Sequence, residues 1–284
     1  MGIGGKLLGF IRTIILFGKE EKIKVIPVVI PMDKEKLLQG KIAMITGGSG
    51  GIGIEIAKAF LQSGAKVILV GAKEEKLRKA CKLLGESDTL RSIPIDITDI
   101  GNITVKVKQA LELFEEKRID ILVNSAGVNG TNDFFNTNEQ EYDRIMDTNV
   151  KGTYFISRVV AQTMIDNNIK GHILMVSSSS ALRPAWAPYQ MSKWAIRGFT
   201  MGLADTLLPY GIIVNSIAPG QTATPMVGKE TINNIYNPYN KIGRYALPQE
   251  IASLAVYMVS GAGDMVVGDT FYITGGSGTI SYHK

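Results

Sequence analysis

Short apolar runs alternate with amphipathic stretches along most of the chain, and this alternation predicts an α/β fold. Three of the runs are GKIAMIT (residues 40–46), KVILV (66–70) and HILMV (172–176). They show no period of two, as expected for strands that are buried on both faces. After the first run, IEIAKAFLQSGA spaces Ile54, Ala57 and Leu61 for a packed helix. Strands that alternate with helices favour a parallel sheet with helices on both of its faces.

The N-terminal segment has a different pattern. Its apolar positions form one helical face: Ile3, Leu7, Phe10, Ile11, Ile14, Ile15 and Phe17. Arg12 interrupts this segment before the 18–20 apolar residues that a membrane-spanning helix needs, on the order of 30 Å of rise. We expect neither a signal peptide nor myristoylation, because no small-residue cleavage site follows and Lys6 stands where Ser or Thr is required. Two interpretations remain: residues 3–17 lie on a membrane surface, or they cover an apolar patch of the body or of a sister subunit.

The length and composition fit one large domain after this extension. With 284 residues, 45% of them hydrophobic and 20% charged, the chain can build one sizeable core. The net charge of +5 is concentrated in residues 1–41, which hold eight Lys or Arg and four Asp or Glu. The remaining body lacks the basic stripe of a nucleic-acid-binding protein. We therefore predict an amphipathic helix and extended linker over residues 1–39, and one large folded domain over residues 40–284.

Cysteine and histidine are too scarce for two classes of site. Cys81 is the single cysteine, so no internal disulfide can form, and a reducing cytoplasmic compartment is expected. His172 and His283 are the only histidines, which leaves too few ligands for a usual zinc site. We expect no metal.

Glycine-rich octapeptides occur near both ends of the body, ITGGSGGI at residues 45–52 and ITGGSGTI at 273–280. The first lies between a predicted strand and a predicted helix, where free N–H groups and the helix dipole favour a pyrophosphate. Strand, glycine turn, helix and strand within about thirty residues predict a Rossmann-type dinucleotide site. Its expected cofactor contacts are Gly47, Ser49, Gly50, Gly51, Ile52 and Gly53. Only four residues follow the second octapeptide, too few for a helix, so we interpret it as a structural chain end near the substrate or a subunit contact.

Further motifs follow in the order of the classical short-chain dehydrogenase/reductase family, which the chain resembles over residues 40–280. The glycine turn reads Thr-Gly-x-x-x-Gly-Ile-Gly, and Ser125 departs from the family's Asn-Asn-Ala-Gly. The other motifs are Asp96–Thr98 (DIT), Asn124–Gly127 (NSAG), Asn149 in NVKGTYF, Tyr189 with Lys193 in Tyr-x-x-x-Lys spacing, and the Pro-Gly turn of APGQTATPM. The resemblance implies one Rossmann-type doubly wound parallel sheet. It also implies cofactor contacts from Asp96, Ile97, Asn124, Ala126, Gly127, Tyr189, Lys193, Pro219, Gly220, Thr222 and Thr224, the last beside the nicotinamide amide.

Tyr189 and Lys193 carry the predicted chemistry. Four residues apart on a helix, they share one face. An isolated tyrosine is a poor acid–base group at neutral pH, whereas a neighbouring ammonium favours the phenolate and makes proton transfer easier. By resemblance, Tyr189 gives its proton to a substrate carbonyl, Lys193 also holds the nicotinamide ribose, and Asn149 supports a water chain.

The catalytic serine is harder to assign, because Ser177 to Ser180 are consecutive. The family places this residue second after the strand, which selects Ser178. However, Ser178 precedes Tyr189 by eleven residues, about two fewer than is common in the family, so Ser177 and Ser179 remain alternatives.

The cofactor preference is predicted from the end of the second strand. Gly71, Ala72 and Lys73 stand there, so no carboxylate repels a 2′-phosphate and Lys73 could pair with one, although it could equally be a solvated lysine. We favour NADP(H) over NAD(H).

The function that fits these motifs is NAD(P)(H)-dependent reduction of a carbonyl or oxidation of its alcohol, in the manner of a 3-oxoacyl reductase. The alternatives are a non-catalytic cofactor-sensing scaffold and a membrane-docked reductase of lipid or cell-surface glycan metabolism. We expect a small-molecule substrate bound near residues 226–250 and a homodimer or homotetramer, with the helix around 192–208 in the interface.

Overall fold

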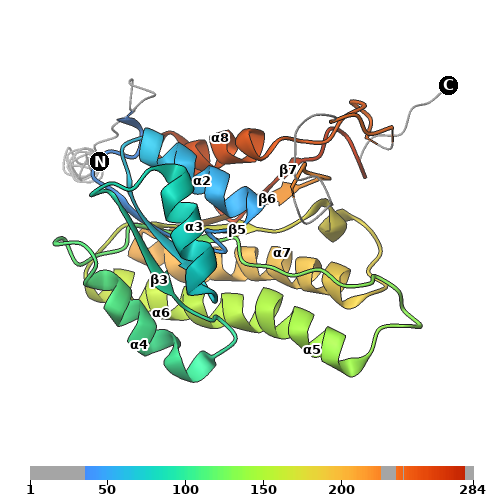
Figure 1. Cartoon of the computed structure of the whole chain (residues 1–284), viewed down its shortest axis with the longest axis horizontal. Coiled ribbons are helices and arrows are strands. Elements are labelled where there is room, and N and C mark those ends of the chain that lie inside the picture. Colours follow the sequence, from blue (N-terminus) through green and yellow to red (C-terminus); the bar gives the residue numbers. More distant parts are fainter. Residues whose placement is uncertain (1–35, 225–234, 239, 279–284) are drawn as a thin grey trace, which may run out of the picture. The chain divides into compact units, whose positions relative to one another are not determined.

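The fold is a parallel sheet covered on both faces by helices (Figure 1). The computed structural model describes residues 36–224, 235–238 and 240–278. Within these ranges the sheet has seven strands in the order β3-β2-β1-β4-β5-β6-β7, and every neighbouring pair is parallel. The strands are β1 (Ile42–Thr46), β2 (Lys66–Gly71), β3 (Leu90–Pro94), β4 (Ile121–Asn124), β5 (His172–Val176), β6 (Ile213–Pro219) and β7 (Thr270–Ile273). The predicted doubly wound α/β architecture is confirmed.

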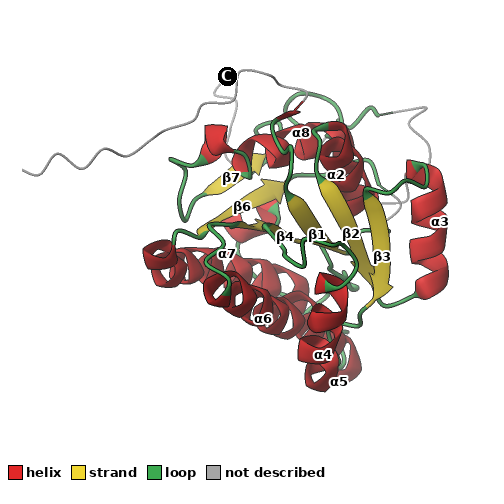
Figure 2. Cartoon of the chain, turned by 90° about the vertical axis from the view of Figure 1, so that its left-hand side faces the viewer, coloured by secondary structure: helices red, strands yellow, loops and turns green. Residues whose placement is uncertain are grey.

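The helices form two layers, one on each face of the sheet (Figure 2). One layer holds α2 (Gly51–Gln62), α3 (Glu74–Leu84) and α8 (Pro248–Met258). The other holds α4 (Ile100–Leu111), α5 (Glu139–Met146), α6 (Thr153–Asp166) and α7 (Pro188–Leu207). Each layer closes its own hydrophobic core against the sheet. This double cover explains the continuous apolar runs, since all five residues of β1 and of β5 are buried.

Helix α2 shows how the sequence pattern translates into packing. Its buried residues are Gly53, Ile56, Ala57 and Phe60, whereas Ile54 and Leu61 pack only partly against the core. The predicted stripe was therefore rotated from the true one, although Ala57 belongs to both. The reason is the entry of the helix, where Gly53 must lie against the glycine turn and thereby sets the rotation of all later positions.

The order of the strands positions the site. The chain runs from β1 outward to β2 and β3, then returns to β4 on the other side of β1. Loops after β1 and β4 diverge to opposite faces at this switch point, which leaves a crevice at the carboxyl ends of the strands.

Three predicted features lie wholly or partly outside the described residues. They are the amphipathic stripe of residues 3–17, part of the loop expected to bind substrate (residues 226–234 and 239 of 226–250) and the chain end from 279 to 284. None of the helices within the described ranges is long and apolar enough to cross a membrane.

Candidate active site

The first glycine turn is a tightly folded cradle between β1 and α2. Gly47 has a positive φ of 64°, and a Cβ there would lie 2.8 Å from the backbone of Ala126. A Cβ on Gly53 would lie 2.3 Å from the Gly47 carbonyl oxygen. Gly50 caps the helix and is exposed, and a Cβ there would meet only the Gly47 oxygen, at 3.3 Å. The turn thus presents the open N-terminus of α2 to the crevice, which is the surface that a dinucleotide pyrophosphate requires.

A second turn, after β4, is bonded directly to the first strand. The Thr46 hydroxyl accepts the N–H groups of Ser125 and Ala126 at 3.1 and 3.2 Å. The side chain of Asn124 does not face the crevice: it donates to Ser157 Oγ at 2.9 Å and is 4% exposed. Ala126 and Gly127 therefore border the site, whereas the Asn124 side chain serves the core beneath it.

The ends of β2 and β3 form the far side of the crevice. Lys73, the N-cap of α3, is exposed, and no carboxylate lies between the end of β2 and this cap. Asp96 is exposed just past β3 and accepts the N–H and hydroxyl of Thr98 at 2.9 and 2.7 Å. Ile97 is 6% exposed and packs in the core.

Asn149 lies in a π-helical segment, Asp147–Gly152, between α5 and α6. Its amide clasps the backbone of Val128, with Oδ1 accepting the N–H at 2.8 Å and Nδ2 donating to the carbonyl at 2.9 Å. Nδ2 also donates to Ser192 Oγ at 3.0 Å. The wide π turn therefore binds the loop after β4 to the helix that carries Tyr189.

Tyr189 and Lys193 occupy the first turns of α7, as predicted. The Lys193 Nζ lies 5.5 Å from the centroid of the Tyr189 ring and donates to the Val176 carbonyl at 3.1 Å. Lys193 is 7% exposed, so its ammonium is held beneath the site rather than in solvent. A Cβ on Gly127 would lie 3.4 Å from Asn149 Oδ1 and 3.8 Å from Lys193 Nζ. These contacts gather Asn149, Lys193 and Tyr189 at one place.

The serines after β5 differ in their surroundings. Ser177 is 4% exposed and its hydroxyl donates to the Lys193 carbonyl at 3.2 Å. The Ser178 hydroxyl accepts the Ser180 N–H at 3.1 Å, which leaves its own proton free to donate. Ser179 begins a short 3₁₀ turn. This geometry favours Ser178, as the sequence did, as the serine that can donate to a substrate.

The Pro-Gly turn after β6 completes the enclosure. Pro219 ends the strand, and Thr222 and Thr224 are 4% and 7% exposed. Their hydroxyls donate to the carbonyls of Gly220 and Thr222 at 3.1 and 3.4 Å.

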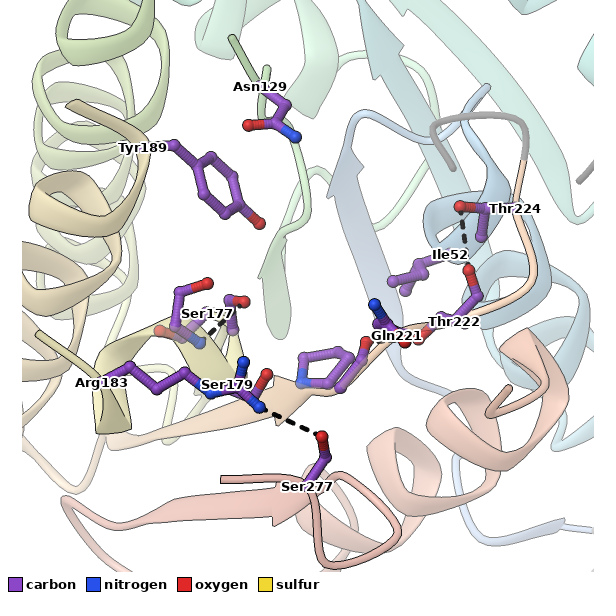
Figure 3. Close-up of a pocket in the computed structure, with 14 residues that line it drawn as sticks. Ile52, Asn129, Ser177, Ser179, Arg183, Tyr189, Gln221, Thr222, Thr224 and Ser277 are labelled. Carbon is purple, nitrogen blue, oxygen red and sulfur yellow. Dashed lines mark hydrogen bonds between the residues drawn. The ribbon is translucent and has the colours of Figure 1, made fainter. Parts of the chain in front are cut away.

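These turns surround a cavity of about 310 Å³ (Figure 3). The Tyr189 hydroxyl points into it, and Ile52, Thr222 and Thr224 line the opposite side. The cavity is bordered by these residues: Ile52, Asn129, Ser177, Ser178, Ser179, Ser180, Arg183, Tyr189, Pro219, Gly220, Gln221, Thr222, Thr224 and Ser277. Residues predicted from four separate motifs thus meet at one cavity, while Lys73 and Asp96 are not among its lining.

Sequence reasoning missed several side chains of the site, among them Asn129 and Gln221 on the border of the cavity. Thr46 joins the two turns and Ser192 joins Asn149 to α7, where it also donates to the Tyr189 carbonyl at 2.7 Å. Arg183 and Ser277 line the cavity and are joined by a hydrogen bond from Arg183 Nη2 to Ser277 Oγ. Ser277 belongs to the second octapeptide, which was the one available signal that this chain end borders the site.

The comparisons with known proteins agree with this geometry. The family model "short chain dehydrogenase" matches residues 41–234. The acetoacetyl-CoA reductase of Acinetobacter sp. (strain RA3849) is 33% identical over 243 residues, covering 83% of this chain and 97% of that protein. The 3-ketoacyl-(acyl-carrier-protein) reductase from Brucella melitensis, complexed with NADH, superposes with a TM-score of 0.75 at 29% identity, covering 86% of this chain and all of that one. An actinorhodin polyketide ketoreductase with NADPH gives 0.75 at 27% identity, covering 84% and 98%.

Two observations settle the family: the model covers more than half of the chain, and the acetoacetyl-CoA reductase is related over nearly its whole length. The glycine cradle is also shaped for the dinucleotide that such enzymes use. The chain belongs to the short-chain dehydrogenase/reductase family and is an NAD(P)-dependent oxidoreductase of C=O and CH–OH groups.

Proposed function

We propose that the protein reduces the carbonyl group of a small 3-oxoacyl-like substrate, with Tyr189 as the general acid. The observation that carries the proposal is the cavity into which the Tyr189 hydroxyl points, with Lys193 held beneath it and Ser178 on its border. The names of the similar acetoacetyl-CoA and 3-ketoacyl reductases support the substrate class.

The side chains divide the work as follows. Tyr189 gives its phenolic proton to the carbonyl oxygen, and Ser178 donates a hydrogen bond to the same oxygen as negative charge develops there. The buried ammonium of Lys193 stabilises the phenolate that remains on Tyr189. Asn149 fixes the loop after β4 against α7 and so keeps these groups in register. In the reverse direction, Tyr189 accepts the alcohol proton.

The residues that would hold the dinucleotide are the glycine turn, the loops after β3 and β4, and the Pro-Gly turn. When bound, a reduced nicotinamide supplies the hydride for the carbonyl carbon. We propose that NADP(H) is preferred, because the end of β2 lacks a carboxylate and Lys73 is exposed there. An NADPH- and NADH-oxidation screen against ketones, keto-sugars and 3-oxoacyl thioesters tests both the substrate class and this preference.

Tyr189→Phe is the decisive variant. We expect kcat to fall at least about a thousandfold, because proton transfer is lost, while the dissociation constant of NADPH stays within about threefold. Turnover is measured by cofactor oxidation and binding by titration of cofactor fluorescence. Retained turnover in Tyr189→Phe would refute the assignment. A wild-type protein that binds NADPH but reduces nothing in the screen would favour the scaffold alternative.

We also propose a catalytic unit over residues 40–284 that assembles as a homodimer or homotetramer in the cytoplasm. Exposed apolar side chains on α6 and α7 support an interface there: Tyr154, Trp194 and Met201 are 46%, 42% and 55% exposed. Light scattering measures the assembly, and a monomeric mass at micromolar concentration contradicts it.

For residues 3–17, co-sedimentation with vesicles, with and without residues 1–24, separates membrane contact from contact with protein.

A further inference from the structure

The catalytic cavity contains a positive charge that the proposed proton transfer does not use. Among the described residues that line it, Arg183 is the only one with a charged side chain. Its Nη2 donates to the neutral Ser277 hydroxyl at 3.1 Å. Within the described ranges, no ion pair joins Arg183 to a carboxylate. Arg183 is exposed, and its guanidinium borders the cavity without a counter-charge, so it can bind an anionic ligand there through charge-assisted hydrogen bonds.

The backbone of Arg183 is fixed relative to the catalytic helix. The Trp194 indole N–H donates to the Arg183 carbonyl at 2.8 Å, and Trp194 directly follows Lys193 on α7. The Arg183 N–H donates to the Ser180 carbonyl at 3.3 Å. The backbone of Arg183 is thus hydrogen-bonded to α7, which carries Tyr189, and to the serine turn, which carries Ser178.

The second octapeptide shapes the other side of Arg183. Gly275 and Gly278 have positive φ values of 59° and 90°, and a Cβ on Gly278 would lie 3.2 Å from Arg183 Nε. The turn also packs against the Pro-Gly loop, because a Cβ on Gly220 would lie 2.9 Å from Thr274 Cα. The glycines therefore let the chain end approach the guanidinium while Ser277 orients it. In Figure 3, Arg183 extends toward Ser277.

We propose that Arg183 and Ser277 form a subsite for an anionic group, a carboxylate or phosphate, that the carbonyl substrate carries close to its reacting carbon. The guanidinium supplies two parallel donors that match the oxygens of such a group, and the Ser277 hydroxyl adds a third. This inference rests on the proposed function and adds to it that the carbonyl substrate is an oxo acid or an oxo phosphate. It also gives the second octapeptide a role in substrate selection.

Matched substrate pairs test the subsite. The pairs are acetoacetate with methyl acetoacetate, and dihydroxyacetone phosphate with dihydroxyacetone, each at saturating NADPH. In the wild-type protein, we expect kcat/KM to favour the anionic member of at least one pair by about tenfold or more. The pair that responds distinguishes carboxylate from phosphate. Arg183→Met lowers kcat/KM for the anionic member about tenfold more than for the neutral member, and Arg183→Lys keeps part of the preference. Arg78→Met, an exposed arginine of α3 outside the cavity, is the matched control and changes neither value.

A binding measurement keeps the test independent of turnover. Malonate and inorganic phosphate are titrated calorimetrically into the NADPH-bound wild-type protein and into Arg183→Met. We expect at least one of these two anions to bind the wild-type protein about tenfold more tightly than it binds Arg183→Met. Equal affinities, equal losses for both members of a pair, or a weaker NADPH affinity in Arg183→Met would overturn the subsite. None of those results changes the outcome of the Tyr189→Phe test. Failure of the anionic subsite can therefore be distinguished from failure of the proposed carbonyl reduction.

Discussion

The consecutive serines after β5 can be told apart by what each hydroxyl contacts. Both Ser177 and Ser178 border the cavity, but the Ser177 hydroxyl donates to the carbonyl of Lys193 from a buried position, whereas the Ser178 hydroxyl accepts the Ser180 N–H and keeps its own proton free. We expect Ser178→Ala to lower kcat about a hundredfold, the usual cost of losing one donor to a developing oxyanion. Ser177→Ala removes one buried hydrogen bond, worth about 1 kcal/mol of unfolding free energy, and leaves kcat within about threefold. Turnover and thermal unfolding of both variants are measured together. The reverse pattern, with turnover lost only in Ser177→Ala, would move the catalytic role to that residue.

Individual residues were predictable where a local pattern carries them. Tyr189 and Lys193 depend only on helical spacing, and the structure places them on one helix as expected. Arg183 could not be predicted, because its position in the cavity depends on Ser277, which is 94 residues away in the chain. The inward direction of Asn124 was equally hidden, since a partner on α6 determines it.

At the level of elements, the glycine turn between β1 and α2 depends on the close packing of Gly53 against the Gly47 carbonyl. A Cβ on Gly53 would lie 2.3 Å from the Gly47 carbonyl oxygen, so the turn or the helix must move. We expect Gly53→Ala to lower the free energy of unfolding by about 2 kcal/mol, as overpacking does, and to weaken NADPH binding at least about tenfold. Chemical denaturation and cofactor titration are the measurements.

The matched control is Gly101→Ala, in the first turn of α4. There the nearest atom to a new Cβ is Asp99 Oδ1, at 3.9 Å. An alanine in an open helical position gains about 0.5–1 kcal/mol in unfolding free energy over glycine. A Gly53→Ala protein as stable and as tight-binding as this control would show that the cradle adapts.

Most of the α/β elements were predictable because strands buried on both faces are continuous apolar runs with turn residues after them. The π-helical segment Asp147–Gly152 was not, since no periodicity distinguishes one wide turn from an α-helix. Its formation depends on contacts from outside the segment, in which Asn149 holds Val128 and Ser192. Which face of α2 is buried was also mispredicted, because the contact between Gly53 and the glycine turn before the helix determines that face.

For the whole molecule, the clearest electrostatic contribution to stability comes from the Arg244–Glu250 pair. The two side chains form a bidentate ion pair at 2.7 and 2.8 Å, and the Glu250 carboxylate also accepts the Leu247 N–H at 2.8 Å. The pair joins the segment before α8 to that helix, and α8 packs in the same core as α2. The Arg244 hydrogen bonds, then the Leu247 N–H, lower the pKa of Glu250 from its ordinary 4.5 to about 2.

This shift predicts how the stability changes with pH. Because the folded protein favours the ionised carboxylate, the stabilisation is complete above about pH 4.5 and is lost as the pH falls toward 2. Both side chains are more than a third exposed, so solvent screening limits the pair to about 1 kcal/mol at pH 7. We expect Glu250→Gln to lose that amount at pH 7 and to approach the wild type at pH 3, as measured by urea unfolding at both values. Glu75→Gln, which breaks the more exposed pair with Lys79, should change little at either pH. A difference between Glu250→Gln and the wild type that stays constant with pH would mean that the packing of the side chain, rather than its charge, stabilises α8.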